Sequence, residues 1–295
     1  MVSAWGKNQV REIQKSLGRY LAILGIVALG IGFFAGLKVT GPSMLYTGGQ
    51  YTEETALFDL RLVSTLGWTQ EDAAFFAGQP GIEAAEGASS LDICVQVGDR
   101  EVVLRALPIS AQVNKPSLTA GRLPVTDGEC LGDSRLFLEE AIGNVLTVTR
   151  QERDGALTEQ TLTLVGLCSS PLYLNESRGT TTLGDGTLDG FLYLPIGCFG
   201  EEIYTELNLR LKNLDRELYS EGYDAQIAEA LEAWKPLAQQ RAELRYETVV
   251  SQAREELNKA QAEYDRGLQE YETAKAEAEA GLRMPELPWN RGRRS

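Results

Sequence analysis

A stretch without charged residues, from Tyr20 to Leu37, limits what this chain can fold into more than any other feature. It reads YLAILGIVALGIGFFAGL, which is 18 residues without Asp, Glu, Lys or Arg. As an α-helix it would rise roughly 27 Å, close to the hydrocarbon thickness of a bilayer. The sequence therefore predicts a transmembrane helix over residues 20–40.

Basic residues are distributed unequally on the two sides of this stretch. Four precede it: Lys7, Arg11, Lys15 and Arg19. Only Lys38 follows it closely, and the next basic residue is Arg61. Because cytoplasmic flanks of membrane helices carry the excess of Lys and Arg, we expect a cytoplasmic N-terminus and an extracytoplasmic bulk of the chain. Residues 1–19 are expected to form an amphipathic segment on the inner membrane surface.

Two other structures also explain an apolar stretch near an N-terminus. A cleaved signal peptide has an apolar core of about 7–15 residues that ends in a small-x-small site. Here the core is longer, and Phe33, Phe34 and Leu37 occupy its exit. A buried helix of a soluble domain rarely lacks polar residues for this long. The membrane span is therefore favoured, and the signal peptide is the main alternative.

The predicted membrane helix has a face of small residues. Ala28, Gly32 and Gly36 recur at every fourth position, and the two glycines form a GxxxG pattern. Small residues allow another helix to approach closely within lipid. This face is therefore predicted to pack against a further membrane helix.

The absence of histidine excludes several kinds of chemistry. Ser-His-Asp and Cys-His catalysis and histidine-ligated metal sites all require that side chain. The sequence also lacks a GxxxxGK[ST] phosphate loop and a GxSxG nucleophile motif. The glycine-rich run 184–190 fits neither a dinucleotide loop nor a calcium loop, so a surface turn is expected there. No catalytic residue, cofactor or metal ligand is predicted, and the chain is not expected to be an enzyme.

The net charge of −14 argues against a nucleic-acid partner. Such binding needs Lys and Arg side chains that neutralise phosphates. An acidic surface instead suits a solvated extracytoplasmic domain.

The four cysteines are far apart in the sequence and form no CxxC pair; they are Cys94, Cys130, Cys168 and Cys198. Outside the cytoplasm cysteines can form disulfides. Two states therefore remain open, namely buried free thiols, which are favoured, and a bridge, for which Cys168–Cys198 is the first candidate.

The middle of the chain alternates strand and helix signals, which predicts an α+β domain over residues 41–214. The membrane helix is expected to continue past Lys38 unless Gly41-Pro42 interrupts it, and Met44–Leu57 is a weak helix signal. Thr69 is expected to cap a helix to about Phe76, with Asp72 as its partner. A second helix is expected around residues 134–142. Period-two patterns predict strands at 58–65, 82–86, 91–97, 102–108, 145–150, 160–168, 190–194 and 206–211.

After Leu214 the composition becomes rich in Ala, Glu, Gln, Lys and Arg. Apolar and small residues then recur at alternating spacings of three and four. They are Val250, Ala253, Leu257, Ala260, Tyr264, Gly267, Tyr271, Ala274 and Ala278. This spacing predicts a coiled-coil helix over residues 215–283 that needs a partner strand. Pro236 is expected to kink this helix or to start a new one.

The last residues, 284–295, leave this pattern abruptly, with two prolines and a basic end. They are expected to form an irregular tail. A natural tail would have this composition, but the favoured interpretation is that the chain is a truncated or frame-shifted piece of a longer protein.

Several segments resemble one family of membrane proteins, and the resemblance covers about residues 8–282. The segments are Arg11–Ile23, Gly30–Lys38, Phe58–Gly67, Gly121–Pro124, Leu164–Tyr173 and Tyr204–Leu207. Together with the order of span, α+β domain and coil, they resemble the FtsX-like or MacB-like permease subunit of bacterial ABC transporters.

This resemblance implies a permease that forms a homo- or heterodimer in the cell membrane and engages a separate cytoplasmic ATP-binding subunit. Residues 41–214 would be a MacB-like extracytoplasmic domain, moved by the ATPase through the span. Export of lipid, lipoprotein or peptide, or regulation of a cell-wall partner, would follow. The family has further spans after this domain, which this sequence does not contain, and the motifs carry over no functional residue. The alternative is a single-pass anchored adaptor that dimerises or docks partners through its coiled coil.

Overall fold

The computed structural model describes residues 6, 9, 11, 12, 15–153, 155–200, 203–214 and 220–282. Most of the predicted amphipathic segment and the whole predicted tail lie outside these residues. The chain divides into two units, Met1–Lys235 and Pro236–Ser295, and each is described by itself. The first unit contains the long helix α2, all ten strands described and the beginning of the last helix, α4. The domain boundaries predicted from the sequence stay a prediction.

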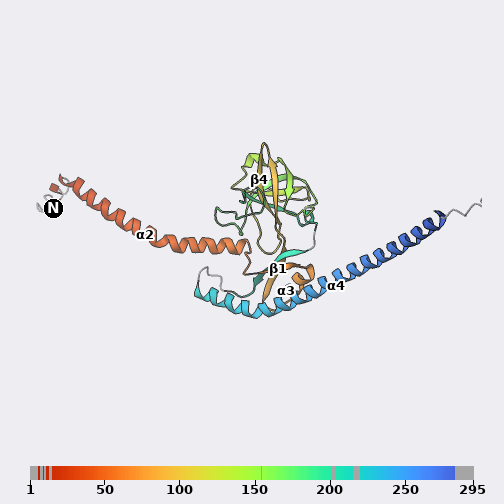
Figure 1. Ribbon diagram of the computed structural model, residues 1–295. Helices are drawn as coiled ribbons and strands as arrows, with labels where there is room; N and C mark the ends of the chain where they lie inside the picture. The colour runs from red at the N-terminus through yellow and green to blue at the C-terminus, as the bar shows by residue number, and fades with distance from the viewer. Residues whose placement is uncertain are drawn as a thin grey trace, which may run out of the picture. The chain divides into compact units, whose positions relative to one another are not determined.

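Helix α2 runs from Leu17 to Glu54 and contains Pro42 (Figure 1). The expected continuation past Lys38 is confirmed and no interruption occurs at Gly41-Pro42, because one helix includes both the apolar stretch and the segment from Met44 onward. A proline removes one backbone donor, which a long helix can lose without ending. None of the side chains of α2 is buried. Among the described helices, α2 alone is long and apolar enough to cross a membrane, a test that a signal sequence also passes.

A small antiparallel sheet follows α2. Its strand order is β1 (Leu60–Trp68), β10 (Tyr204–Leu211) and β2 (Ile82–Ala88). Between β1 and β2 lies α3 (Gln70–Ala77). The predicted capping box is confirmed, since Thr69 N–H donates to Asp72 Oδ2 at 2.9 Å and Asp72 N–H donates to Thr69 Oγ1 at 3.3 Å.

The larger sheet closes on itself. Its strands are β3 (Leu91–Val97), β4 (Arg100–Pro108), β5 (Ser117–Gly121), β6 (Glu129–Asp133), β7 (Val145–Gln151), β8 (Thr161–Ser169) and β9 (Gly190–Leu194). They are ordered β5-β8-β6-β9-β4-β3-β7, and β7 also pairs with β8. All of these strands except β5 therefore form a closed barrel, while β5 adds to β8 from outside.

Alternation along the strands fills this barrel. Leu91, Ile93 and Val95 of β3 are at most 1% exposed and belong to one core with Leu104 of β4 and Leu192 of β9. The same period of two had predicted β3, β4 and β9, and all three are confirmed. The remaining predicted strands are also present, with ends that differ by a few residues.

The larger sheet differs from the sequence predictions in three places. Strands β5 and β6 were not predicted, and the helix expected at residues 134–142 is wrong. That segment holds only a short 3-10 turn, Glu139–Ala141. Asp133 begins a single turn there, since its backbone oxygen accepts from the N–H groups of Leu136 and Phe137 and its side chain accepts from Arg135 N–H, but the following residues do not continue it into a helix. The surface turn expected at residues 184–190 is confirmed, with Gly184 and Gly186 at positive φ.

All four cysteines are free and buried. This is the favoured of the two states left open by the sequence. Burial raises the pKa of the Cys130 and Cys198 thiols to about 12. Because the thiolate is the reactive form, these side chains should react slowly.

We expect iodoacetamide at pH 8 to label none of the four cysteines in the folded chain and all four after denaturation without reductant. Mass spectrometry of the intact protein counts the labels. If two cysteines stay unlabelled in the denatured, unreduced chain, the disulfide alternative is correct.

Helix α4 runs from Glu221 to Leu282. It continues through Pro236, so the start of a new helix at that residue is wrong. In the first unit Trp234 of α4 lies close to Gly81, which has φ +90° and precedes β2. In the second unit the predicted seam residues are exposed, apart from the half-buried Val250. The coiled coil stays a prediction.

Candidate functional site

The predicted packing face of α2 is open in the structure. A shallow apolar hollow lies along it, and its lining includes Ala28 and Gly32 but not Gly36. A side-chain carbon added at Gly32 or Gly36 would meet no described atom within 4 Å. The face therefore has room for a second helix, and its role as a packing face stays a prediction.

The C-terminal end of α2 is joined to the small sheet by one buried arginine. Arg210 of β10 places Nη2 2.6 Å from Glu53 Oε1 at the end of α2, and Nε 3.3 Å from Glu83 Oε2 of β2. The Arg210 side chain is 3% exposed, whereas the two glutamates are about half exposed. A buried guanidinium needs such partners, because an unpaired buried charge is costly.

The backbone after α2 adds a second connection. Thr55 O accepts from Lys115 N–H at 2.8 Å, and Ala56 O accepts from Asn114 N–H at 2.9 Å. The side-chain oxygen of Asn114 accepts in turn from Phe58 N–H at 3.0 Å. Ala56 and Asn114 both have positive φ, at 50° and 57°. These bonds fix the direction in which the chain leaves the helix.

Asp59 connects the same region to the beginning of α4. Its Oδ2 accepts from Leu211 N–H at 2.7 Å, and its Oδ1 accepts from the Tyr223 hydroxyl at 3.2 Å. The last residues of α2, the small sheet and the first turn of α4 are therefore bonded together. We call this region, Glu53–Asp59 with Arg210 and Tyr223, the junction.

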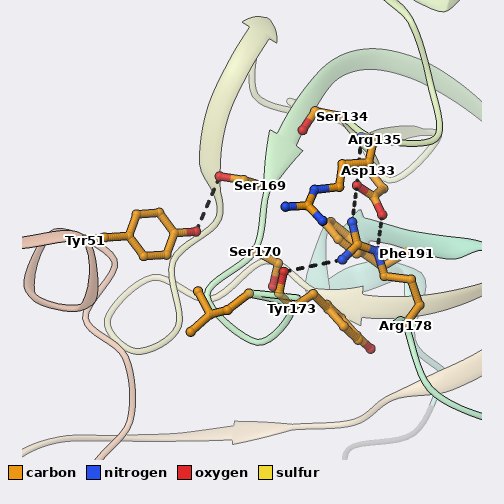
Figure 2. A pocket seen from close by; sticks show the side chains of 10 residues that line it. Tyr51, Asp133, Ser134, Arg135, Ser169, Ser170, Tyr173, Arg178 and Phe191 are labelled. Carbon is orange, nitrogen blue, oxygen red and sulfur yellow. Dashed lines mark hydrogen bonds and ion pairs between the residues drawn. The ribbon is translucent and has the colours of Figure 1, made fainter. Parts of the chain in front are cut away.

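A hollow of about 230 Å³ lies beside the junction (Figure 2). Tyr51, in the last turn of α2, forms one wall. The other lining residues come from the ends of β6 and β8, from the loop after β8 and from β9. They are Asp133, Ser134, Arg135, Ser169, Ser170, Tyr173, Leu174, Arg178 and Phe191. The hollow thus lies between α2 and the closed barrel.

A buried ion pair forms the floor of the hollow. Arg178 Nε donates to Asp133 Oδ2 at 2.6 Å, and Arg178 Nη2 donates to Asp133 Oδ1 at 3.0 Å. Both side chains are at most 5% exposed. Arg178 Nη1 donates to the carbonyl oxygen of Asn175 at 2.8 Å, which ties the loop after β8 to the pair. A two-point arrangement of this kind fixes orientation as well as charge.

Aromatic rings cover the arginine. The rings of Tyr173 and Phe191 stack at 5.1 Å with an interplanar angle of 7°, and the Arg178 guanidinium lies 5.6 and 5.4 Å from their centres. Such contacts between a cation and a ring are favourable. Burial raises the pKa of the Tyr173 hydroxyl, which keeps it protonated and neutral at pH 7.

The hydroxyl groups of Tyr51, Ser169 and Ser170 line the remaining wall, and the buried Tyr193 lies behind Ser170. Tyr51 and Ser169 place their oxygens 3.4 Å apart, and Ser170 and Tyr193 place theirs 2.8 Å apart. The Tyr51–Ser169 distance is long for a hydrogen bond between hydroxyls, so both hydroxyls can donate to another acceptor. No group of histidine, cysteine, aspartate or glutamate in the described residues could hold a metal ion.

The sequence did not indicate the junction or the hollow. Asp133 and Arg178 are 45 positions apart, and Arg178 lies in a loop without any periodic pattern. The predicted face of α2 and the predicted seam of α4 belong to other parts of the chain.

No family model and no curated protein sequence matches the chain. Among solved structures, it is similar to the extracellular domain of the noncanonic ABC-type transporter YknZ from Gram-positive bacteria. Identity is 12%, the match covers 52% of this chain and 78% of that one, and the TM-score is 0.36. It is also similar to the periplasmic region of MacB from Actinobacillus actinomycetemcomitans, with 13% identity, coverage of 64% and 84%, and a TM-score of 0.35.

Proposed function

We propose that this chain is a membrane permease subunit of an ABC transporter of the FtsX/MacB type, without chemistry of its own. The sequence resemblance and the order of apolar helix, α+β domain and long helix support the proposal. A separate ATP-binding subunit in the cytoplasm would drive it, in a dimer of permease chains. The cargo would be a lipid, lipoprotein or peptide, or the output would be regulation of a cell-wall partner.

The observation that most supports a mechanical role is the junction. At 1.5 Å per residue, the 38 residues of α2 rise roughly 57 Å, whereas the bilayer core is about 30 Å thick. The helix therefore extends well past the lipid, with a bend partway along its length (Figure 1). The ion pairs of Arg210 and the hydrogen bonds of Asp59 attach the end of this helix to the domain. A tilt of the helix would thus move the domain.

The alternative proposal is a single-pass adaptor. The exposed seam residues of α4 favour it, since Leu257, Tyr264 and Tyr271 are each about two-thirds exposed. Such an adaptor would dimerise or dock partners through α4 and would not respond to ATP.

Spin labels can separate the two proposals. Because the native thiols are buried, Asp99→Cys in the exposed β3–β4 turn offers one reactive site per chain. We expect an impermeant maleimide to label it in intact spheroplasts. In a dimer reconstituted with an ATP-binding subunit that co-purifies with the chain, the distance between labels should change on adding ATP. No dimer, or a distance that ignores ATP, would contradict the permease proposal and leave the adaptor.

The variant Arg210→Met tests the junction. Methionine fills a similar space but removes both ion pairs, so ATP should move the label less while the dimer still assembles. Arg61→Met is the matched control, because Arg61 is 52% exposed and its 3.5 Å contact with Glu206 does not involve α2. A full distance change in Arg210→Met would show that the junction does not transmit motion.

A further inference from the structure

We infer that the hollow beside the junction binds a small monocarboxylate through the guanidinium of Arg135. This inference goes beyond the proposed transport role and stands without it. It rests on the charge, the hydrogen-bonding groups and the size of the hollow.

One of the two cations in the hollow has no carboxylate partner among the described residues. Asp133 and Arg178 neutralise one another in the floor. Arg135 is exposed, and no carboxylate of the described residues forms an ion pair with its guanidinium. Figure 2 shows this guanidinium turned toward the side of the hollow where Ser169 and Tyr51 lie. In a chain of net charge −14, an arginine in a hollow without a carboxylate partner is a specific place for an anion.

A neighbouring hollow provides the comparison. It has about 370 Å³ and contains two arginines, Arg61 and Arg105. Both are already paired, since Arg61 lies 3.5 Å from Glu206 and Arg105 donates to Asp92 at 2.7 and 3.0 Å. That hollow therefore offers no spare positive charge, in contrast to the one that contains Arg135.

The hydroxyl groups suit a carboxylate. Tyr51 and Ser169 are only loosely bonded to one another, at 3.4 Å, and each can turn its proton toward an anion. The side chain of Ser134 lines the same space. One guanidinium and neutral hydroxyls balance a single negative charge. A phosphate ester carries roughly 1.5 to 2 negative charges at pH 7, and the charge beyond the first would lie near Asp133 without a partner.

The size and the apolar wall define the rest of the ligand. A volume of about 230 Å³ is below that of ordinary drug-sized pockets. The ring of Tyr173 and the side chain of Leu174 offer a small apolar contact. A short branched acid fits this description, and so does the C-terminal carboxylate of a peptide that ends in an apolar residue.

A ligand bound in the hollow would contact the last turn of α2 directly. Tyr51 is two residues from Glu53, which pairs with Arg210 in the junction. A ligand that bonds the Tyr51 hydroxyl would restrain this last turn of the helix.

Calorimetric titration of the full chain in detergent tests the inference. The probes are isovalerate for a free acid, N-acetyl-Gly-Leu for a peptide terminus, the amide of each, and inorganic phosphate. We expect at least one acid to bind saturably and at least tenfold more tightly than its amide. The better of the two acids identifies the source. Equal binding of acid and amide, tighter binding of phosphate, or no binding of either acid would overturn the inference.

Two variants locate the site. Arg135→Gln should weaken the binding of the acid at least tenfold. Arg150→Gln, an exposed arginine on β7 outside the hollow, should change it less than twofold. Thermal unfolding should be the same for both variants, since both side chains are exposed. Unchanged binding in Arg135→Gln, or equal loss in both variants, would also overturn the inference.

Discussion

Replacing Arg178 with alanine should lower the free energy of unfolding of the closed barrel by about 3–5 kcal/mol. The substitution leaves the Asp133 carboxylate, which is 2% exposed, without its counter-charge. It also removes the donor to Asn175 O and the cation that lies against Tyr173 and Phe191. The cost is large because an unpaired charge stays buried, not because the intact pair is itself strongly stabilising.

Alkylation of a buried thiol measures this loss of stability. Cys168 lies on β8 and is 0% exposed, so its alkylation as a function of urea concentration reports opening of the barrel in the full chain. Mass spectrometry then gives the midpoint for this residue alone. The control is Arg100→Ala, whose 3.4 Å contact with Asp189 involves a 71% exposed arginine. Exposed pairs of this kind contribute only about 0–1 kcal/mol. If the two variants lose the same stability, burial of the Asp133–Arg178 pair does not make its loss more costly than the loss of an exposed pair.

Local patterns explain which elements could be predicted. β3 and β4 are rich in apolar, mostly buried residues, and α2 contains the long uncharged stretch, so each is encoded within a few neighbouring positions. β6 is only five residues long, and it exists because β8 and β9 pair with its two edges. β5 has exposed side chains and depends on one edge of β8. Such long-range pairing leaves no periodic signal in the strand itself.

The site is also formed by contacts between residues that are far apart in the sequence. The pairs Asp133–Arg178 and Glu53–Arg210 each join residues that are far apart in the chain, and nothing at either residue indicates its partner. The hollow and the junction therefore arise only in the folded chain and leave no local signal in the sequence. The packing face of α2 and the seam of α4 follow from spacing alone, and their partners would come from other chains.

Gly121→Ala should cost about 2–5 kcal/mol in the same assay. Gly121 ends β5 with φ +75°, a conformation that alanine adopts at a cost of about 1–2 kcal/mol. The added carbon would also lie 2.4 Å from Val165 O and 2.7 Å from Gly166 Cα on β8. Both are backbone atoms of a central strand, so the pairing of β5 with β8 would have to open.

Two matched glycines separate these contributions. Gly143 has φ +97° but open space around it, so alanine there should cost only the conformational part, about 1–2 kcal/mol. Gly128 has neither a positive φ nor a neighbour within 4 Å, so alanine there should stay within about 0.5 kcal/mol of the original chain. The order Gly121, Gly143, Gly128 is therefore expected for the loss of stability. If Gly121→Ala costs no more than Gly143→Ala, β5 can shift away from β8 without loss, and the close contact at Gly121 does not fix the position of β5.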